Sequence, residues 1–184
     1  MISFLLVPIY TDVMAPGKYG EITLIFSWFA IFNVFLAYGM ETAFFRFYKE
    51  ADNRKKVVST SLLSIMGSTI LLVLIGILFK EKLSIALNID LPFMNYVLGI
   101  LALDALAIIP FAWLRANEKP MRYAIVKILN VSLNLGFTLF FLILLPKMAD
   151  GTSTGFLNSI YKPDYEIPYI LISTLIASGV TLLL

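Results

Sequence analysis

The sequence predicts an all-α fold, a polytopic transmembrane helix bundle of about five to six membrane segments. Three observations predict it: 60% of the 184 residues are hydrophobic, only 14% are charged, and the mean hydropathy is +0.90. Soluble globular chains are roughly half apolar and a quarter charged, and a water-soluble fold of this size cannot hide so much apolar surface. A soluble protein with unusually buried helices is the less favoured alternative.

Each predicted membrane segment is an apolar run of about 20 residues, the length with which a helix crosses a bilayer. The runs fall at residues 22–40, 57–79, 96–114, 123–145 and 167–184. Residues 1–14 are apolar but too short to span, and we interpret them as the end of a helix whose first part is missing. We therefore expect residues 1–184 to be a single, partial transmembrane domain of a longer protein; a genuine small protein with a re-entrant first segment is the alternative.

The segments between the spans carry the signals for loops and orientation. Residues 80–95 alternate apolar and polar side chains, which predicts a short interfacial helix, and residues 146–166 read as a loop rich in Pro, Gly, Asp, Ser and Thr. Eight basic residues cluster within 41–56 and 115–122, against five in the loops of the other side. Because cytoplasmic loops are enriched in Lys and Arg, these two loops are predicted to be cytoplasmic.

Composition excludes several classes of function. The chain has no cysteine and no histidine, so disulfides, thiol chemistry and histidine-ligated metal sites are excluded. A net charge of +2 gives no basic field for nucleic acid. No catalytic constellation, phosphate-binding glycine loop or metal-ligand cluster occurs in the sequence. We expect a protein that is not an enzyme, needs no cofactor and binds no nucleic acid.

Asp104 is the most unusual residue inside a predicted span. It lies in the middle of residues 96–114, six residues before Pro110. A carboxylate at that depth is costly to insert, so it must face the bundle or a water-filled cavity. Contact with a proton, a cation or a head group is one interpretation, and an internal salt bridge or hydrogen bond is supported equally well.

A polar stripe follows one face of the span at residues 123–145. Lys127, Asn130, Asn134 and Thr138 are spaced i, i+3, i+7 and i+11. Such a stripe lines a cavity or joins neighbouring helices, and its length favours the cavity. Lys127 is a candidate partner for Asp104, with snorkelling to the membrane surface as its alternative.

Glu41 and Arg46 lie at the end of the first full span, five residues apart. On an α-helix this separation turns them about 140° from one another, too far for the pairing that a spacing of three or four allows. Each is expected to find a partner on another helix or on a ligand. Arg46 suits bidentate binding of phosphate, although an anchor at the head-group level is slightly favoured.

The first part of the chain resembles the start of the Wzx-type polysaccharide-biosynthesis flippases, which belong to the multidrug/oligosaccharidyl-lipid/polysaccharide exporter superfamily. The resemblance lies in the stretch "LLVPIYTDVMAPGKYGE", the span that follows it, and the stretch "YGMETAFFRFYKEADN". The resembling positions are Pro8, Tyr10, Pro16, Tyr19, Gly20, Glu21, Tyr38, Gly39, Glu41, Ala43, Phe45 and Arg46. The stretch "WLRANEKPMRYAIVKILNVSLNLG" is similar to the loop and fifth helix of that family. Asp12 departs from the pattern, which has a basic residue after "YT".

The resemblance implies the first half of a transporter of about 12–14 helices in two similar halves, with a cavity open alternately to either side. It implies a bacterial cytoplasmic (inner) membrane protein that flips undecaprenyl-pyrophosphate-linked oligosaccharide for O-antigen or capsule synthesis. Its partners would be this lipid-linked substrate, membrane lipids and, as candidates, the polysaccharide polymerase and glycosyltransferases. Bases attract pyrophosphate and amides bind sugar hydroxyls. The candidate cavity residues are Glu41, Arg46, Asp104, Lys127, Asn130 and Asn134.

Two other functions fit the same sequence. A cation-coupled multidrug or metabolite exporter of the same superfamily would suit Asp104, although "YGMETAFFRF" favours the flippase. A non-transporting membrane scaffold subunit would suit close helix packing, which the small residues Ser61, Ser64 and Ser68 predict.

Overall fold

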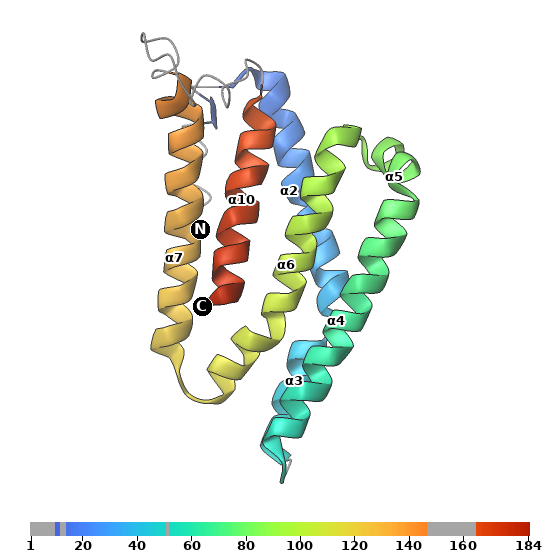
Figure 1. Cartoon of the computed structure of the whole chain (residues 1–184), viewed down its shortest axis with the longest axis vertical. Coiled ribbons are helices and arrows are strands. Elements are labelled where there is room, and N and C mark those ends of the chain that lie inside the picture. The colour runs from blue at the N-terminus through green and yellow to red at the C-terminus, as the bar shows by residue number, and fades with distance from the viewer. Residues whose placement is uncertain (1–9, 12–13, 51, 147–164) are drawn as a thin grey trace.

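The computed structural model describes residues 10–11, 14–50, 52–146 and 165–184, and in these residues all regular structure is helical (Figure 1). The helices are α2 (Pro16–Ala37), α3 (Met40–Glu50), α4 (Arg54–Leu78), α5 (Lys80–Leu87), α6 (Leu91–Ala116), α7 (Pro120–Leu139), a π-helical turn η1 (Phe140–Leu144) and α10 (Glu166–Leu183). Within this part of the chain, five helical stretches are long and apolar enough to cross a membrane. The prediction of an all-α fold with about five helices able to cross a membrane is therefore confirmed in the described residues, whereas the full set of 12–14 helices stays a prediction.

The first span differs from its predicted bounds at both ends. The helix begins at Pro16, six residues before the predicted start, because proline suits the first helical position. It ends at Ala37, and Tyr38 and Gly39 follow with φ of 29° and 72°. This backbone break ends one helix and starts the next at Met40, so the prediction of a continuous helix over 22–40 is wrong at its end.

The connections partly match their predictions. Residues 80–95 hold the short helix α5, but it stops at Leu87, where Asn88 adopts a left-handed conformation with φ of 54°. The next span, α6, then starts at Leu91, five residues before its predicted start. Most of the predicted segment 1–14 and nearly all of the predicted loop 146–166 lie outside the described residues.

Helix α6 is the centre of the described bundle. It packs against α2, α3, α4 and α10, and α10 packs in turn against α7 (Figure 1). Ile25 of α2, Ile100 of α6 and Ile170 of α10 are all fully or almost fully buried in one core cluster. A second cluster joins α3, α4 and α6. The first cluster thus holds α2 and α10 against α6, and the second holds α3 and α4 against α6.

The packing face of α4 differs from the predicted one. Ser61, Ile65 and Thr69 are buried, whereas Ser64 is exposed and its hydroxyl lies 3.1 Å from that of Tyr38. The predicted face of Ser61, Ser64 and Ser68 is therefore wrong as a packing unit. At Gly76 an added Cβ would lie 2.5 Å from Leu98 Cδ2 of α6, so the Leu98 side chain would have to shift to admit one.

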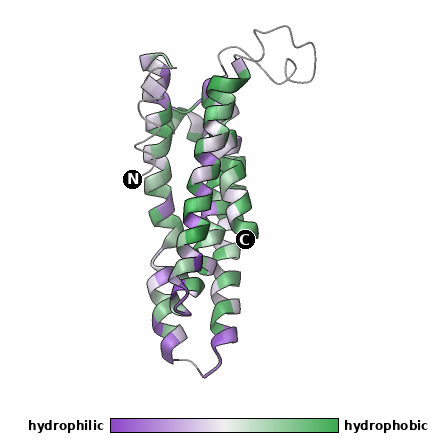
Figure 2. Cartoon of the chain, turned by 90° about the vertical axis from the view of Figure 1, so that its left-hand side faces the viewer, coloured by the Kyte–Doolittle hydropathy of each residue, from purple (hydrophilic) through white to green (hydrophobic). Residues whose placement is uncertain are grey.

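The outer surface is apolar, as a lipid-facing surface must be. Large hydrophobic side chains of α4 are exposed, among them Leu63, Ile70, Leu74 and Leu78. Figure 2 shows hydrophobic residues along the length of the helices, hydrophilic residues gathered at the lower end, and hydrophilic patches part-way along. Polar groups inside such an apolar bundle are costly to insert into a membrane, so those that are present indicate a structural or functional role.

Candidate functional site: a polar cleft between α2 and α7

A cleft runs between α2 and α7. Helix α2 packs mainly on α6, and α7 packs on α10, so that α2 and α7 are not closely packed against each other. Two cavities occupy this space, with volumes of about 640 Å³ and about 440 Å³. They adjoin, because Asp104, Asn130, Asn134 and Thr174 line both. We call the combined space the α2–α7 cleft; α6 and α10 form its floor.

Asp104 lies where the two cavities meet. Its Oδ1 accepts a hydrogen bond of 2.9 Å from Ser178 Oγ of α10, and Asn33 of α2 also interacts with this carboxyl group. The structure thus supports part of each interpretation of Asp104, because the carboxylate is bonded to a neighbouring helix and borders a cavity. It is half-buried rather than sealed in the core.

Lys127 borders the same cavity as Asp104 without forming an ion pair with it. The two groups interact electrostatically, but the Lys127 ammonium lies 4.7 Å from the centre of the Phe111 ring. Among the described residues Lys127 has no acidic partner within ion-pair distance. Lys127, the candidate partner of Asp104, therefore interacts with it electrostatically without a direct ion pair, and both line the cleft.

Asn130 and Asn134 of the polar stripe join α7 to α10 and line the cleft at the same time, whereas Thr138 is buried and donates to Asn134 Oδ1 at 3.3 Å. Asn130 Nδ2 donates to Thr181 Oγ1 at 2.7 Å, and Asn134 Nδ2 donates to Thr174 Oγ1 at 3.1 Å. Each threonine hydroxyl gives its own proton to a backbone carbonyl of α10, which leaves its oxygen to accept the amide. Both roles that the spacing allowed are present.

An ion pair lies at the end of the cleft nearest the α6–α7 turn. Arg115 Nη2 is 2.6 Å from Glu41 Oε1, and the Arg115 Nε–H donates to the Phe111 carbonyl at 3.4 Å. The Arg115 guanidinium carbon also lies 5.6 Å from the ring centre of Phe45 and 5.1 Å from that of Tyr123. Glu41 thus has the partner on another helix that its sequence position predicted.

The structure brings five of the six candidate residues to one cleft. These are Glu41, Asp104, Lys127, Asn130 and Asn134. Arg46 is exposed on α3, lines neither cavity, and makes no ion pair with the described residues. A role of any of the six in substrate contact stays a prediction.

Sequence reasoning missed several residues of this site. Arg115 was counted only as a loop charge, since its pairing with a residue 74 positions earlier leaves no local signal. Thr23, Ser27 and Asn33 place polar groups of α2 in the cleft. The spacing of four between Thr23 and Ser27 was the available sign that these two share a helical face.

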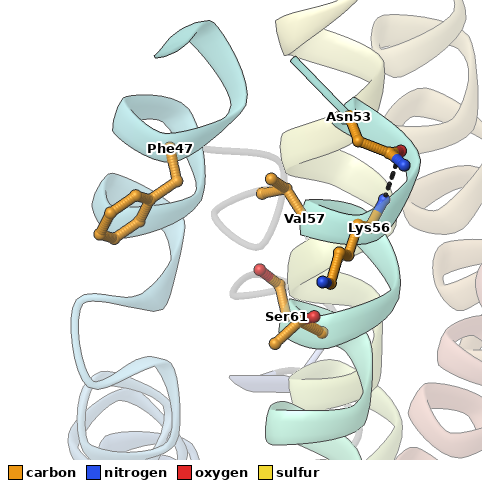
Figure 3. A pocket seen from close by; sticks show the side chains of 6 residues that line it. Phe47, Asn53, Lys56, Val57 and Ser61 are labelled. Carbon is orange, nitrogen blue, oxygen red and sulfur yellow. Dashed lines mark hydrogen bonds between the residues drawn. The ribbon is translucent and has the colours of Figure 1, made fainter. Parts of the chain in front are cut away.

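A second hollow, of about 410 Å³, lies between α3 and α4 (Figure 3). Phe47 of α3 and Val57 and Ser61 of α4 line it. Asn53 caps α4 by accepting the Lys56 N–H at 3.2 Å. None of the six candidate residues lines this hollow, and Lys56 is its one charged lining residue. It offers far fewer polar groups than the α2–α7 cleft.

The chemistry of the cleft is that of binding. It combines two carboxylates, those of Glu41 and Asp104, with two cations near one end and a row of amides and hydroxyls. Within the described residues, no group of three His, Cys, Asp or Glu side chains is placed to hold a metal ion. A comparison of the chain with family models, curated proteins and solved structures finds no match.

Proposed function

We propose that this protein is a membrane transporter that flips a lipid-linked oligosaccharide between the leaflets of a bacterial inner membrane. The observation that carries the proposal is the α2–α7 cleft, a polar hollow within a bundle whose outer surface is apolar. Polar and ionisable groups at membrane depth are costly and mark the paths of substrates or ions. The resemblance of residues 5–21 and 38–53 to Wzx-type flippases supports the choice of substrate.

The arrangement of groups suits the two parts of such a substrate. A flippase must conduct a polar, anionic head group while the lipid tail stays in the bilayer. Arg115 and Lys127 would attract the pyrophosphate at one end of the cleft, and Asn130 and Asn134 would bind sugar hydroxyls further in. The positive-inside rule places the Arg115 end on the cytoplasmic side, where the substrate would enter.

A cation-coupled exporter of small molecules is the second candidate. The Asp104 carboxylate favours it, because this group borders the cleft with Ser178 and Asn33 beside it and could take up a proton or a cation. A coupling site is also compatible with a flippase. The flippase and the exporter therefore differ in the molecule that they transport, and a transport measurement distinguishes them.

A transport measurement tests the proposal. The full-length protein is reconstituted into vesicles that contain undecaprenyl-pyrophosphate-linked oligosaccharide with a fluorescent sugar, and an impermeant quencher reports the label left outside. We expect the protein to equilibrate the label between leaflets, and Lys127→Ala to slow this about tenfold, through loss of one charge-assisted contact with pyrophosphate. Lys49→Ala, an exposed lysine outside the cleft, is the control and should leave the rate unchanged.

The same vesicles separate the rivals. Quenching no faster than in protein-free vesicles would refute the flippase. Uptake of a small organic cation driven by a proton or sodium gradient, without movement of the labelled lipid, would identify the exporter instead.

A further inference from the structure

We infer that Arg115 is the anion-binding group of the α2–α7 cleft, and that Glu41 is an internal counter-ion which a phosphate or pyrophosphate group displaces. The inference rests on the proposed function and assigns its head-group site to a residue that the sequence did not single out. Arg46, the arginine expected to bind phosphate, is exposed and outside the cleft.

The Arg115 guanidinium is held in place by contacts that do not involve Glu41. Its Nε–H bonds to the Phe111 carbonyl, and its plane lies near the rings of Phe45 and Tyr123. These three contacts do not depend on Glu41, so they continue to orient the guanidinium when Glu41 departs. Apart from Nε and the Nη2 that meets Glu41, its N–H groups make no hydrogen bond to the described residues. A fixed arginine with donors to spare matches the bidentate geometry of a phosphate oxygen pair.

The ion pair between Glu41 and Arg115 is open enough to exchange. The side chains are 41% and 36% exposed, and ion pairs in such surroundings contribute little free energy because solvent screens them. Glu41 also stands in the first turn of α3, so its carboxylate keeps one stabilising interaction when the ion pair with Arg115 breaks. The partial positive charge at a helix N-terminus stabilises a carboxylate there.

Lys127 supplies a second positive charge to the same cavity. Its ammonium lies on the Phe111 ring, and that ring meets Tyr123, the ring beside Arg115, edge to face with centres 5.4 Å apart. Two cations thus flank one aromatic pair and border one cavity. A pyrophosphate carries two phosphate groups, so this arrangement suits a diphosphate better than it suits a single carboxylate.

Binding of inorganic pyrophosphate to the purified full-length protein, in nanodiscs of zwitterionic lipid, tests the inference by calorimetry. We expect Glu41→Gln to raise the affinity about two- to fivefold, since the competitor is removed. Arg115→Gln should lower it about tenfold or more, the usual cost of losing hydrogen bonds to a charged group. The affinity of Arg115→Lys for pyrophosphate should fall between those of the wild type and Arg115→Gln, because lysine keeps the charge and loses the planar fork.

Arg54→Gln is the matched control. Arg54 also lies over an aromatic ring, at 5.4 Å from the centre of Tyr48, but lines neither cavity of the cleft. This variant loses the same charge and the same kind of ring contact, and its affinity for pyrophosphate should equal that of the wild type. Circular dichroism and unfolding temperature establish that each variant is folded, and Arg115→Lys gives the answer if Arg115→Gln is not.

Competition identifies where the phosphate comes from. Undecaprenyl pyrophosphate and phosphatidylglycerol are each added to the nanodiscs, and displacement of inorganic pyrophosphate is measured. Displacement of pyrophosphate by either lipid in the wild type but not in Arg115→Gln supports the site. The lipid that displaces pyrophosphate at the lower concentration identifies the class of lipid that binds there.

Equal pyrophosphate affinity in the wild type and both Arg115 variants would overturn the inference, as would absence of binding in both the wild type and Glu41→Gln. Its failure is distinct from failure of the proposed function. Arg115-dependent binding without lipid flipping would refute the flippase alone. Flipping with binding that ignores Arg115 would refute the inference alone.

Discussion

Replacing Asp104 with leucine is expected to abolish transport while leaving the bundle at least as stable as before. The carboxylate lies in the middle of an apolar span, accepts a hydrogen bond of 2.9 Å from Ser178 and also interacts with Asn33. Removing a carboxylate from membrane depth relieves an insertion cost of about 3 kcal/mol, which offsets the lost hydrogen bond. Flipping rates in vesicles and unfolding temperatures in detergent measure the two effects.

Asp104→Asn separates a functional from a structural role, because asparagine keeps the shape and can still accept the Ser178 hydrogen bond. We expect it to be as inactive as the leucine variant. Asp90→Leu, an exposed aspartate just before α6, should transport normally. Normal transport by Asp104→Asn together with a large loss of stability in Asp104→Leu would show that Asp104 serves only to hold α6 and α10 together.

Reversing the charge of Arg115 is expected to damage both stability and transport. In Arg115→Glu two carboxylates would face each other where Arg115 Nη2 and Glu41 Oε1 now lie 2.6 Å apart. At this partly exposed site the cost should be on the order of 1 kcal/mol, which corresponds to about 2–4 °C in unfolding temperature. Transport should fall to the protein-free rate, because the anion would meet two negative groups.

The double variant Glu41→Arg with Arg115→Glu should recover stability but not transport. The swap restores an ion pair, yet the contacts with Phe45, Tyr123 and the Phe111 carbonyl hold a guanidinium only at position 115. Arg54→Glu makes the same charge change outside the cleft and should transport normally. Recovery of transport in the double variant would mean that the position of the guanidinium does not matter, against the role given to Arg115.

The helices could be predicted from the sequence because their signals are local. An uninterrupted apolar run of bilayer length is visible without knowing any neighbour. Helices α4, α6 and α10 cover their predicted runs almost completely, and α7 does so together with η1. The shared face of Lys127, Asn130 and Asn134 follows from helical spacing alone, and all three line the cleft.

The contacts between helices could not be predicted in this way. Glu41 pairs with Arg115, and Asp104 accepts a hydrogen bond from Ser178. Each pair is 74 positions apart in the sequence, and the residues next to one partner carry no sign of the other. The break at Tyr38 and Gly39 was hidden inside an apolar run that reads as one helix. The identity of the substrate rests on the resemblance and on the residue types in the cleft, and is a proposal.

Cysteine accessibility tests most directly the central claim that the α2–α7 cleft holds water inside an apolar bundle. These 184 residues hold no cysteine, so no native thiol within them competes with a single substitution. A charged methanethiosulfonate reagent reacts with thiolates, which form in water and not in lipid. We predict fast labelling of Asn134→Cys and Ser27→Cys, from the two walls of the cleft, in native membranes, and none of Ile128→Cys, 60% exposed on the apolar side of α7. Labelling of Ile128→Cys with protection of both cleft positions would contradict the claim.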